Sequence, residues 1–135
     1  MTDQLNAFLD QWSKPGAHAR PPASASAVSA KRGYTVWALV LFTGCMPDKS
    51  GRCHAQADFS VLRPDGSTYS ANPSTEIWRA PPPAKGELQL STARLGIHVR
   101  KADPLGTYRV RAEVRDVEGH RRVALEQPLT VVDAK

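Results

Sequence analysis

The chain has 135 residues, of which 41% are hydrophobic and 23% charged, and its formal net charge at pH 7 is +5. This composition is typical of a soluble globular protein, and the length has room for one domain plus a tail. The longest apolar run, residues 36–42, is too short to cross a bilayer. Basic residues are spread along the chain rather than gathered in a tract with interleaved aromatic residues, so we expect no nucleic-acid partner.

A short amphipathic helix is predicted within residues 1–14, followed by a linker over residues 15–32. The apolar side chains of the helix recur at helical spacing: Leu5, Phe8, Leu9 and Trp12. A helix of this length is marginal on its own, so we expect it to dock on its own domain, dock on a partner, or fray. The linker is rich in Pro, Ala and Ser, and residues 25–30 allow a weak edge strand.

Residues 33–133 predict one all-β domain of about seven or eight short strands. Strands are expected at residues 34–43, 55–61, 67–69, 76–79, 87–90, 95–100, 108–116 and 121–132. The first is a near-continuous apolar run, typical of a central strand covered on both faces. Arg63-Pro64-Asp65-Gly66 is a strong turn signal that closes a hairpin. Pro128 indicates that the last strand switches partners or lies at an edge.

The clearest pattern in the chain is the alternation of residues 108–116. One set of side chains is apolar or aromatic: Tyr108, Val110, Ala112 and Val114. The other set is charged: Arg109, Arg111, Glu113 and Arg115. Successive side chains of a strand face opposite sides of a sheet, so this strand has one buried and one solvated face. Together with the absence of a helical pattern in the body, it predicts an antiparallel two-sheet sandwich.

The chain has two cysteines, Cys45 and Cys53, at the ends of a short polar loop. The ends of such a loop reach disulfide distance readily, and we predict that the two form a disulfide. Disulfides persist outside the cytosol, which favours a periplasmic or secreted protein. Met1 is followed by Thr-Asp-Gln rather than by a signal peptide. Either the protein is cytoplasmic or Met1 replaces a removed targeting segment, and the cysteines favour the second alternative.

Asp103, Gly106 and Tyr108, followed by the alternating strand and a last hairpin, resemble the penultimate strand of immunoglobulin-like and fibronectin-III-like domains. The resemblance implies a tyrosine corner, in which the Tyr108 hydroxyl bonds the backbone upstream, with Trp37 as a core aromatic beneath it. The spacing from Asp103 to Tyr108 is one residue longer than in that family, and no cysteine follows Tyr108. The disulfide is therefore expected to be local rather than between sheets.

The wider pattern resembles small, uncharacterised envelope proteins of Gram-negative bacteria. Its features are a Gly-Cys loop, the Arg-Pro-Asp-Gly turn, an aromatic-Arg-Ala-Pro-Pro-Pro segment at residues 78–83, and Asp-Pro-Leu-Gly-x-Tyr at residues 103–108. This resemblance covers residues 33–132 and implies a fold and a periplasmic location, with no activity to carry over.

Catalytic and metal sites find little support in the sequence. Cys45, Cys53 and His54 suit zinc or copper, but a tetrahedral structural site needs four ligands. The other histidines lie in separate segments: His18, His98 and His120. No Ser lies in a Gly-x-Ser-x-Gly elbow, and cysteines in a disulfide cannot act as thiolates. We therefore expect no cofactor, no metal and no enzyme activity.

Two surface features remain as candidate binding sites. The first is an arginine face made of Arg109, Arg111, Arg115, Arg121 and Arg122. It is either a docking surface for an acidic partner, an anionic glycan or a lipid head group, or a solvated face neutralised by nearby Glu residues. The second is Trp78, which either presents its ring to a sugar or peptide or caps the open end of the sandwich.

These observations favour a non-catalytic β-sandwich that serves as an interaction or accessory module of the bacterial envelope. Its expected partner is another envelope protein, with neither nucleic acid nor a membrane span involved; the pattern does not predict an oligomeric state. One alternative is a small-ligand or carbohydrate-binding domain that uses Trp78. A less favoured alternative is a metal- or redox-linked enzyme that uses Cys45 and Cys53.

Overall fold

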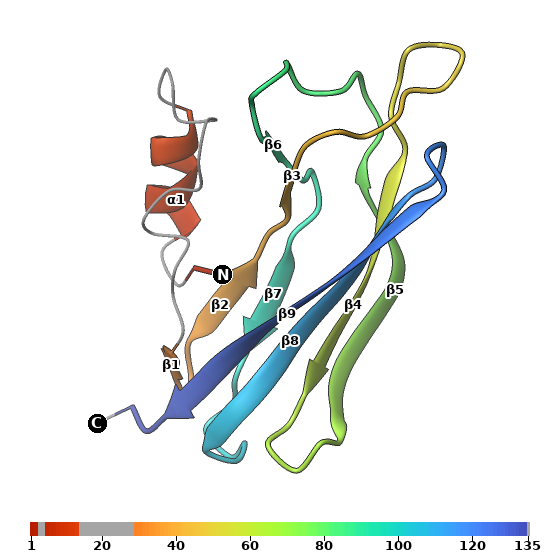
Figure 1. Ribbon diagram of the computed structural model, residues 1–135. Helices are drawn as coiled ribbons and strands as arrows, with labels where there is room; N and C mark the ends of the chain where they lie inside the picture. The colour runs from red at the N-terminus through yellow and green to blue at the C-terminus, as the bar shows by residue number, and fades with distance from the viewer. Residues whose placement is uncertain (3–4, 14–28, 135) are drawn as a thin grey trace.

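The structure, a computed structural model, describes residues 1–2, 5–13 and 29–134 (Figure 1). These residues form one helix and nine strands, so the expected all-β body is confirmed. The elements are α1 (Leu5–Trp12), β1 (Ser29–Lys31), β2 (Thr35–Ala38), β3 (Leu41–Phe42), β4 (Ala55–Leu62), β5 (Thr68–Trp78), β6 (Gln89–Leu90), β7 (Leu95–His98), β8 (Gly106–Asp116) and β9 (Arg121–Val132). Most of the predicted linker, residues 15–28, lies outside the described residues.

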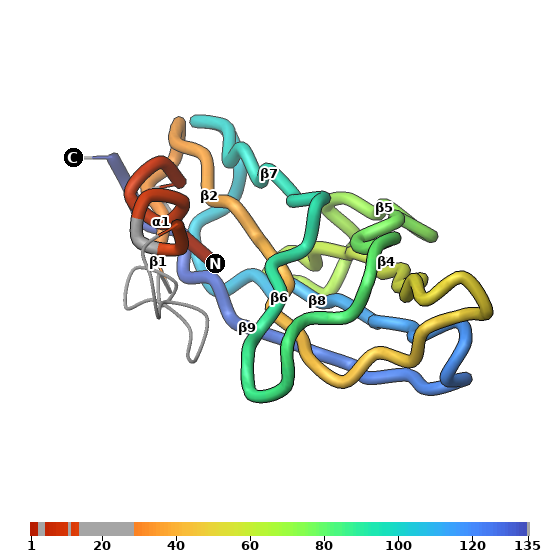
Figure 2. The backbone as a smooth tube through the Cα atoms, turned by 90° about the horizontal axis from the view of Figure 1, so that it is seen from above, coloured from red at the N-terminus to blue at the C-terminus, as the bar shows by residue number. Residues whose placement is uncertain are grey.

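The strands form one five-stranded sheet and two small sheets. The large sheet has the order β1-β9-β8-β4-β5, and the small ones pair β2 with β7 and β3 with β6. All pairs are antiparallel except β1 with β9, which is parallel. The small sheets lie across one face of the large sheet (Figures 1 and 2). The main core cluster joins the two layers, with Val36 and Ile97 from β2 and β7 packed with Val61 and Tyr108 from β4 and β8.

The alternation predicted for β8 is present, but its burial is uneven. Tyr108 and Val110 are buried, whereas Ala112 and Val114, on the same face, are only half-buried. The second layer therefore covers one half of β8 well and leaves the other half near solvent.

Tyr108 anchors the covered half of the core. Its side chain is fully buried, and its hydroxyl donates a hydrogen bond to the Pro104 carbonyl at 2.8 Å. Its ring meets Tyr69 edge-to-face, with the centroids 5.7 Å apart. The Tyr69 hydroxyl lies 2.7 Å from Asp103 Oδ2 and 2.8 Å from the His98 carbonyl oxygen. The tyrosine pair thereby connects β5 and β8 with the loop that leads into β8.

The apolar run at residues 34–43 differs from its prediction as a central strand covered on both faces. It is divided into β2 and β3, and the side chains of β2 alternate between half-buried and buried. Trp37 is consequently on the opposite side of β2 from the core residue Val36 and does not lie beneath Tyr108. Its ring covers Gly96 on β7, where a Cβ atom would lie only 2.9 Å from the indole. The missing side chain of Gly96 makes room for the tryptophan.

The segments predicted at residues 67–69 and 76–79 belong to a single strand, β5. Its pairing with β4 shifts register between Ala57 and Phe59, opposite Pro73 and Ser74. Ser74 has a positive φ of 52°. A bulge of this kind accommodates Pro, which cannot donate a ladder hydrogen bond, and it interrupts the alternation by which a strand is recognised in a sequence.

Of the strands that the structure describes, none pairs with β9 at Pro128 on the side away from β8, so Pro128 lies at an edge, one of the two alternatives predicted for it. The Arg32 amide donates to the Val132 carbonyl at 3.0 Å, so the backbone groups of Val132 point away from β8. Alternate residues of a strand point their backbone groups the same way, and the β8–β9 register has no shift between Pro128 and Val131. The position of the missing N–H of Pro128 therefore also points away from β8. Within the described residues β1 accompanies β9 only from Thr130 to Val132. In the part of the chain that the structure describes, the rest of β9 pairs with β8 alone.

The N-terminal segment docks on its own domain. Thr2 is fully buried and pairs with Trp37 through two backbone hydrogen bonds of 2.8 and 2.7 Å. Phe8 and Trp12 of α1 are buried, and their rings stack with centroids 6.5 Å apart. Figures 1 and 2 both place α1 beside β2. Among the described residues no helix has the length and apolarity needed to span a membrane.

Acid should destabilise this fold through its hydrogen-bonded carboxylates. The pKa of Asp103 is held below its usual 3.8 by the Tyr69 hydroxyl, and that of Asp58 by the Arg115 guanidinium. The pKa of Glu126 is lowered from 4.5 by Arg111. Since the folded state binds these protons less readily, their stabilisation is present above the unfolded pKa values and is lost as pH falls through the lower folded values.

We therefore expect the urea midpoint of unfolding to fall between about pH 5 and pH 3. The Asp103→Asn variant should be less stable at neutral pH and show a shallower decline. A midpoint that rises on acidification would contradict this assignment.

Candidate functional site

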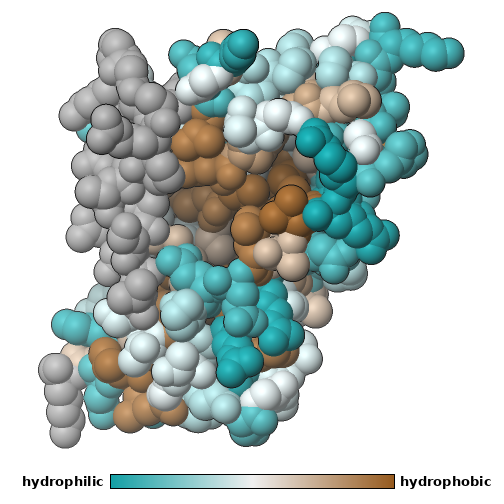
Figure 3. Space-filling model, in the orientation of Figure 1, coloured by the Kyte–Doolittle hydropathy of each residue, from teal (hydrophilic) through white to brown (hydrophobic). Residues whose placement is uncertain are grey.

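An apolar groove opens between β3 and β9. It has a volume of about 370 Å³, and its walls come from β3 and the residues around it on one side and from β8 and β9 on the other. The face shown in Figure 3 has a hydrophobic hollow around β3. The principal apolar side chains of the groove are Val40, Phe42, Leu88, Val114, Val123 and Leu125.

The groove exists because the two layers differ in extent. β3 has only two residues, whereas β9 has twelve. Val123 and Leu125 lie on the inner side of β9, but because the short β3 leaves them uncovered they are 55% and 46% exposed. A second cleft of about 210 Å³ shares Val40 and Leu125 with the first, so the apolar surface continues toward β2. Exposed aliphatic side chains gathered in a cleft are typical of a binding site rather than of ordinary surface.

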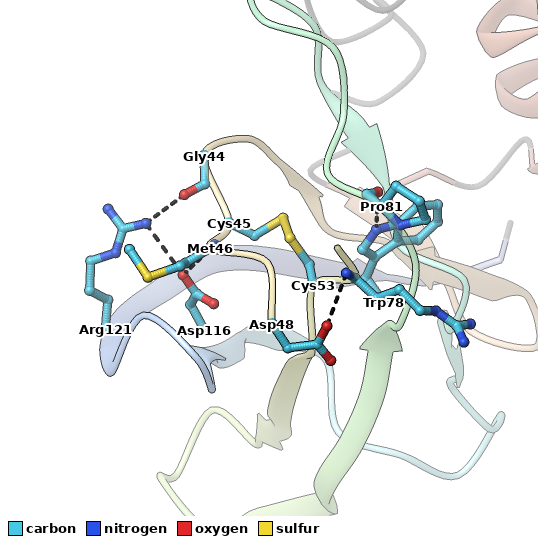
Figure 4. Close-up of a disulfide and its surroundings, with 10 residues drawn as sticks. Gly44, Cys45, Met46, Asp48, Cys53, Trp78, Pro81, Asp116 and Arg121 are labelled. Atoms are coloured by element: carbon cyan, nitrogen blue, oxygen red, sulfur yellow. Dashed lines mark hydrogen bonds and ion pairs between the residues drawn. A yellow bond between two sulfur atoms is a disulfide. The ribbon is translucent and has the colours of Figure 1, made fainter. Parts of the chain in front are cut away.

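Two ionisable residues, Arg121 and Asp116, line the groove at the end where β8 and β9 meet in their hairpin. Figure 4 shows their contacts with Gly44 and Met46. Arg121 Nη2 donates to the Gly44 carbonyl at 2.5 Å and lies 3.3 Å from Asp116 Oδ2. The same carboxyl oxygen accepts a hydrogen bond from the Met46 amide at 3.1 Å. The Asp116 side chain is only 14% exposed, whereas that of Arg121 is 63% exposed. A molecule entering the groove therefore meets the guanidinium before the carboxyl group.

The predicted disulfide joins Cys45 to Cys53 and holds this end of the groove in place. The Cα atoms of the two cysteines are 6.0 Å apart, and Cys53 is fully buried. Within the loop that they close, Asp48 Oδ1 accepts hydrogen bonds from Ser50 and from the Arg52 amide. The hydroxyl of Ser50 lowers the pKa of Asp48. The bond thus fixes the segment whose backbone contacts both Arg121 and Asp116.

The structure does not bring the five predicted arginines to one surface. Arg121 lies on the inner side of β9, whereas the other four lie on the outer side of the large sheet. Three of those four form ion pairs: Arg111 with Glu126 at 2.5 Å, Arg122 with Glu113 at 3.0 Å, and Arg115 with Asp58. Within the described residues Arg109 has no ion pair. The solvated, neutralised alternative describes most of this face.

Trp78 is half-buried at the end of the sheets, where its contacts are those of a capping residue. Its ring meets Phe42 edge-to-face at 6.1 Å, and its indole N–H donates to the Pro81 carbonyl at 3.0 Å. The single donor of the side chain is thus already used. Trp78 supports the wall of the groove from behind Phe42.

The residues proposed for metal or redox chemistry are engaged elsewhere. Both cysteine sulfurs are in the disulfide, and His54 lies 3.4 Å from Glu76 and near Arg79. His98 Nδ1 lies 3.0 Å from the Thr35 hydroxyl. In the described ranges there is no group of three or more His, Cys, Asp or Glu side chains placed to hold a metal ion.

Sequence reasoning missed the residues that form the groove, above all Asp116, Val123 and Leu125. The alternation of β9 indicates that Val123 and Leu125 face inward, but it does not indicate whether the opposite layer reaches them. Asp116 had a weak local signal in the glycine that follows it in the turn. A Cβ atom at Gly119 would lie 2.3 Å from Asp116 Oδ2, so the turn needs glycine to admit this carboxyl group.

Comparison with known proteins yields likeness of structure but not of sequence. No protein-family model and no curated protein sequence matches the chain. A family 123 glycoside hydrolase from Clostridium perfringens, studied for glycolipid glycan hydrolysis, aligns with 78% of this chain at a TM-score of 0.54 and 10% identity. The aligned part is 22% of the hydrolase, so the chain spans about a fifth of that enzyme.

Two other solved structures show weaker likeness. A Niemann-Pick type C2 protein from the Japanese carpenter ant covers 82% of this chain, with 84% of its own length, a TM-score of 0.49 and 12% identity. The alkylpurine DNA glycosylase AlkC from Pseudomonas fluorescens was solved with DNA containing an abasic site analog. It aligns with 77% of this chain over 28% of its own length, at a TM-score of 0.43 and 14% identity. At these identities the comparisons concern the fold and not the activity.

Proposed function

We propose that this chain is a non-catalytic binding module of the bacterial envelope, built as an immunoglobulin-like two-layer sandwich. The fully buried Tyr108, with its hydroxyl bonded to a carbonyl four residues upstream, supports the immunoglobulin-like assignment. The disulfide supports an oxidising compartment. Both cysteines are unavailable as thiolates, which supports a role in binding rather than in catalysis.

The observation that carries this proposal is the groove between β3 and β9. Its volume of about 370 Å³ lies in the range of small-molecule sites, and its lining is largely aliphatic and aromatic with polar groups at one end. The ligand that fits this arrangement is a small amphiphile with an apolar chain and an anionic head. The chain would lie along Val123 and Leu125, and the head would face Arg121.

The anionic head follows from the relative exposure of the two ionisable residues. Asp116 is enclosed, with one oxygen engaged by Met46 and Arg121. The Arg121 guanidinium uses one nitrogen for those contacts and is largely exposed, so other N–H donors remain for a carboxylate. The arginine face offers less to an acidic partner, because three of its outer arginines already have carboxylate partners.

Titration calorimetry with dodecanoate tests this function. We expect saturable binding by the native protein and at least about a tenfold loss of affinity in Leu125→Asp, which places a like charge on the apolar wall. Val132→Asp is the matched control, since Val132 lies on the same strand with a similar exposure of 41% but outside the groove. Its affinity should be unchanged.

A second arm tests the head group. Arg121→Gln should weaken dodecanoate severalfold and leave the binding of dodecanol unchanged, because the alcohol carries no charge for the guanidinium to recognise. Absence of dodecanoate binding by the native protein, or equal losses in Leu125→Asp and Val132→Asp, would overturn the proposal.

A further inference from the structure

We infer that the edge of β9 that faces away from β8, which is unpaired from residue 122 to 126 within the described residues, pairs with β9 of a second copy of this chain. The two strands run antiparallel about a two-fold axis, with Ala124 opposite Ala124 of the second copy. The inference rests on the backbone and the charge pattern of β9, and it is independent of any ligand in the groove.

The backbone of β9 presents a usable edge. The hydrogen bond from Arg32 to the Val132 carbonyl shows that even-numbered residues of β9 point their backbone groups away from β8. The β8–β9 register runs without a shift from Asp116↔Arg121 to Gly106↔Val131, so this parity holds along the whole strand. The N–H and C=O groups of Arg122, Ala124 and Glu126 therefore point outward. Among the described residues, no strand pairs with them on that side.

The outer side chains of this edge are self-complementary in charge. With Ala124 at the two-fold axis, Arg122 lies opposite Glu126 of the second copy, and Glu126 lies opposite its Arg122. The side chains of Arg122 and Glu126 are 71% and 47% exposed, so each can reach across the seam. Since Arg122 already pairs with Glu113 and Glu126 with Arg111, the dimer would align alternating charges in a row. Opposite charges facing each other across antiparallel strands stabilise the pairing.

The inner side chains of the same edge are complementary in polarity. In this register Val123 lies opposite Leu125 of the second copy, and each is about half exposed in one chain. These positions are non-hydrogen-bonded pairs across the seam, where facing side chains approach most closely. Pairing would withdraw four aliphatic side chains from water. A shift of one residue would lose both the charge pairs and the aliphatic pairs, because it would place charged side chains opposite aliphatic ones.

Counted over the described ranges, the unpaired edge of β9 has the length that this register needs. The hairpin turn of the second copy, at His120, falls opposite Pro128, which has no N–H to offer. The next outward-pointing residue, Thr130, is already paired with Ser29 of β1. The paired stretch thus ends where β9 stops being available. Three outward-facing pairs, centred on Ala124, each exchange two backbone hydrogen bonds.

Sedimentation equilibrium of the full chain tests the inference with a charge-swap design. We expect the native protein to form a dimer, and Arg122→Glu and Glu126→Arg each to raise its dissociation constant about tenfold or more, because like charges then meet twice across the seam. An equimolar mixture of the two variants should form a heterodimer, since acidic residues on one edge then face basic residues on the other. Formation of this heterodimer would also show that both variants are folded.

Two further variants separate the edge from the rest of the face. Ala124→Pro removes an outward N–H, as Pro128 does on the same strand, and should give a monomer. Arg109→Glu changes an outer-face charge away from the edge and should leave the dimer intact. The inference would be refuted by a native protein that is monomeric at its highest soluble concentration, or by Arg122→Glu, Glu126→Arg or Ala124→Pro variants that each dimerise like the native chain. Dodecanoate binding by monomeric Ala124→Pro would show that the groove binds its ligand without the dimer.

Discussion

Replacement of Tyr108 by alanine is expected to lower the free energy of unfolding by about 3–5 kcal/mol, the usual cost of removing a fully buried large aromatic side chain. Tyr108 has no exposed surface and lies in the cluster that joins the two layers. Its removal also leaves the Pro104 carbonyl without the hydrogen bond from the tyrosine hydroxyl and removes the edge-to-face contact with Tyr69. Urea unfolding followed by tryptophan fluorescence measures the loss.

The conservative variant Tyr108→Phe separates the ring from the hydroxyl. It keeps the packing and removes only the hydrogen bond to Pro104, so we expect a loss of about 1 kcal/mol. A loss in Tyr108→Phe as large as that in Tyr108→Ala would show that the hydroxyl, and not the ring, holds this part of the core. A loss below about 1 kcal/mol in Tyr108→Ala would show that the two layers are held together elsewhere.

Replacement of both Cys45 and Cys53 by alanine is expected to cost about 2–3 kcal/mol of stability, from the loop entropy that the cross-link removes from the unfolded chain. The double variant avoids a lone thiol. Reduction of the native protein is the matched measurement, because it opens the same bond without changing the buried volume. A midpoint of unfolding that does not respond to reductant would contradict the bond.

The same variant should weaken dodecanoate binding as well. Gly44 and Met46 flank Cys45, and their backbone groups contact Arg121 and Asp116 at the end of the groove. When the loop is released, the guanidinium is no longer held at one position. Calorimetry at a temperature where the variant is fully folded separates this effect from the loss of stability.

Strands with one buried and one solvated face could be predicted well from the sequence. β9 runs over residues 121–132 as expected, and β4 and β8 agree with their predictions to within two residues. In these segments the period of two is directly visible, since polar and apolar residues alternate. The Arg63–Gly66 turn is also as expected, with Asp65 accepting hydrogen bonds from Ser67. Local chemistry determines such features.

What escaped prediction depends on contacts between distant parts of the chain. The alternation of β9 assigns Val123 to the inner side, but only the short length of β3 exposes it. Trp37 was expected in the core because it is large and aromatic, and it lies instead over Gly96 on β7. The ion pair between Arg115 and Asp58 joins residues 57 positions apart, so the arginines appeared as a surplus of charge. A sequence pattern assigns a side chain to one face of a strand, but it does not determine which distant residues contact that side chain.

The two ends of the molecule are closed by different chemistry. At one end Tyr69 and Tyr108 clasp the strands through aromatic and hydrogen-bonded contacts, and at the other a covalent bond secures the loop after β3. Val123 and Leu125, which line the groove between these two ends, are half exposed and belong to neither buried core cluster. Substitutions at these two positions can therefore change which molecules the groove accepts while the fold stays intact.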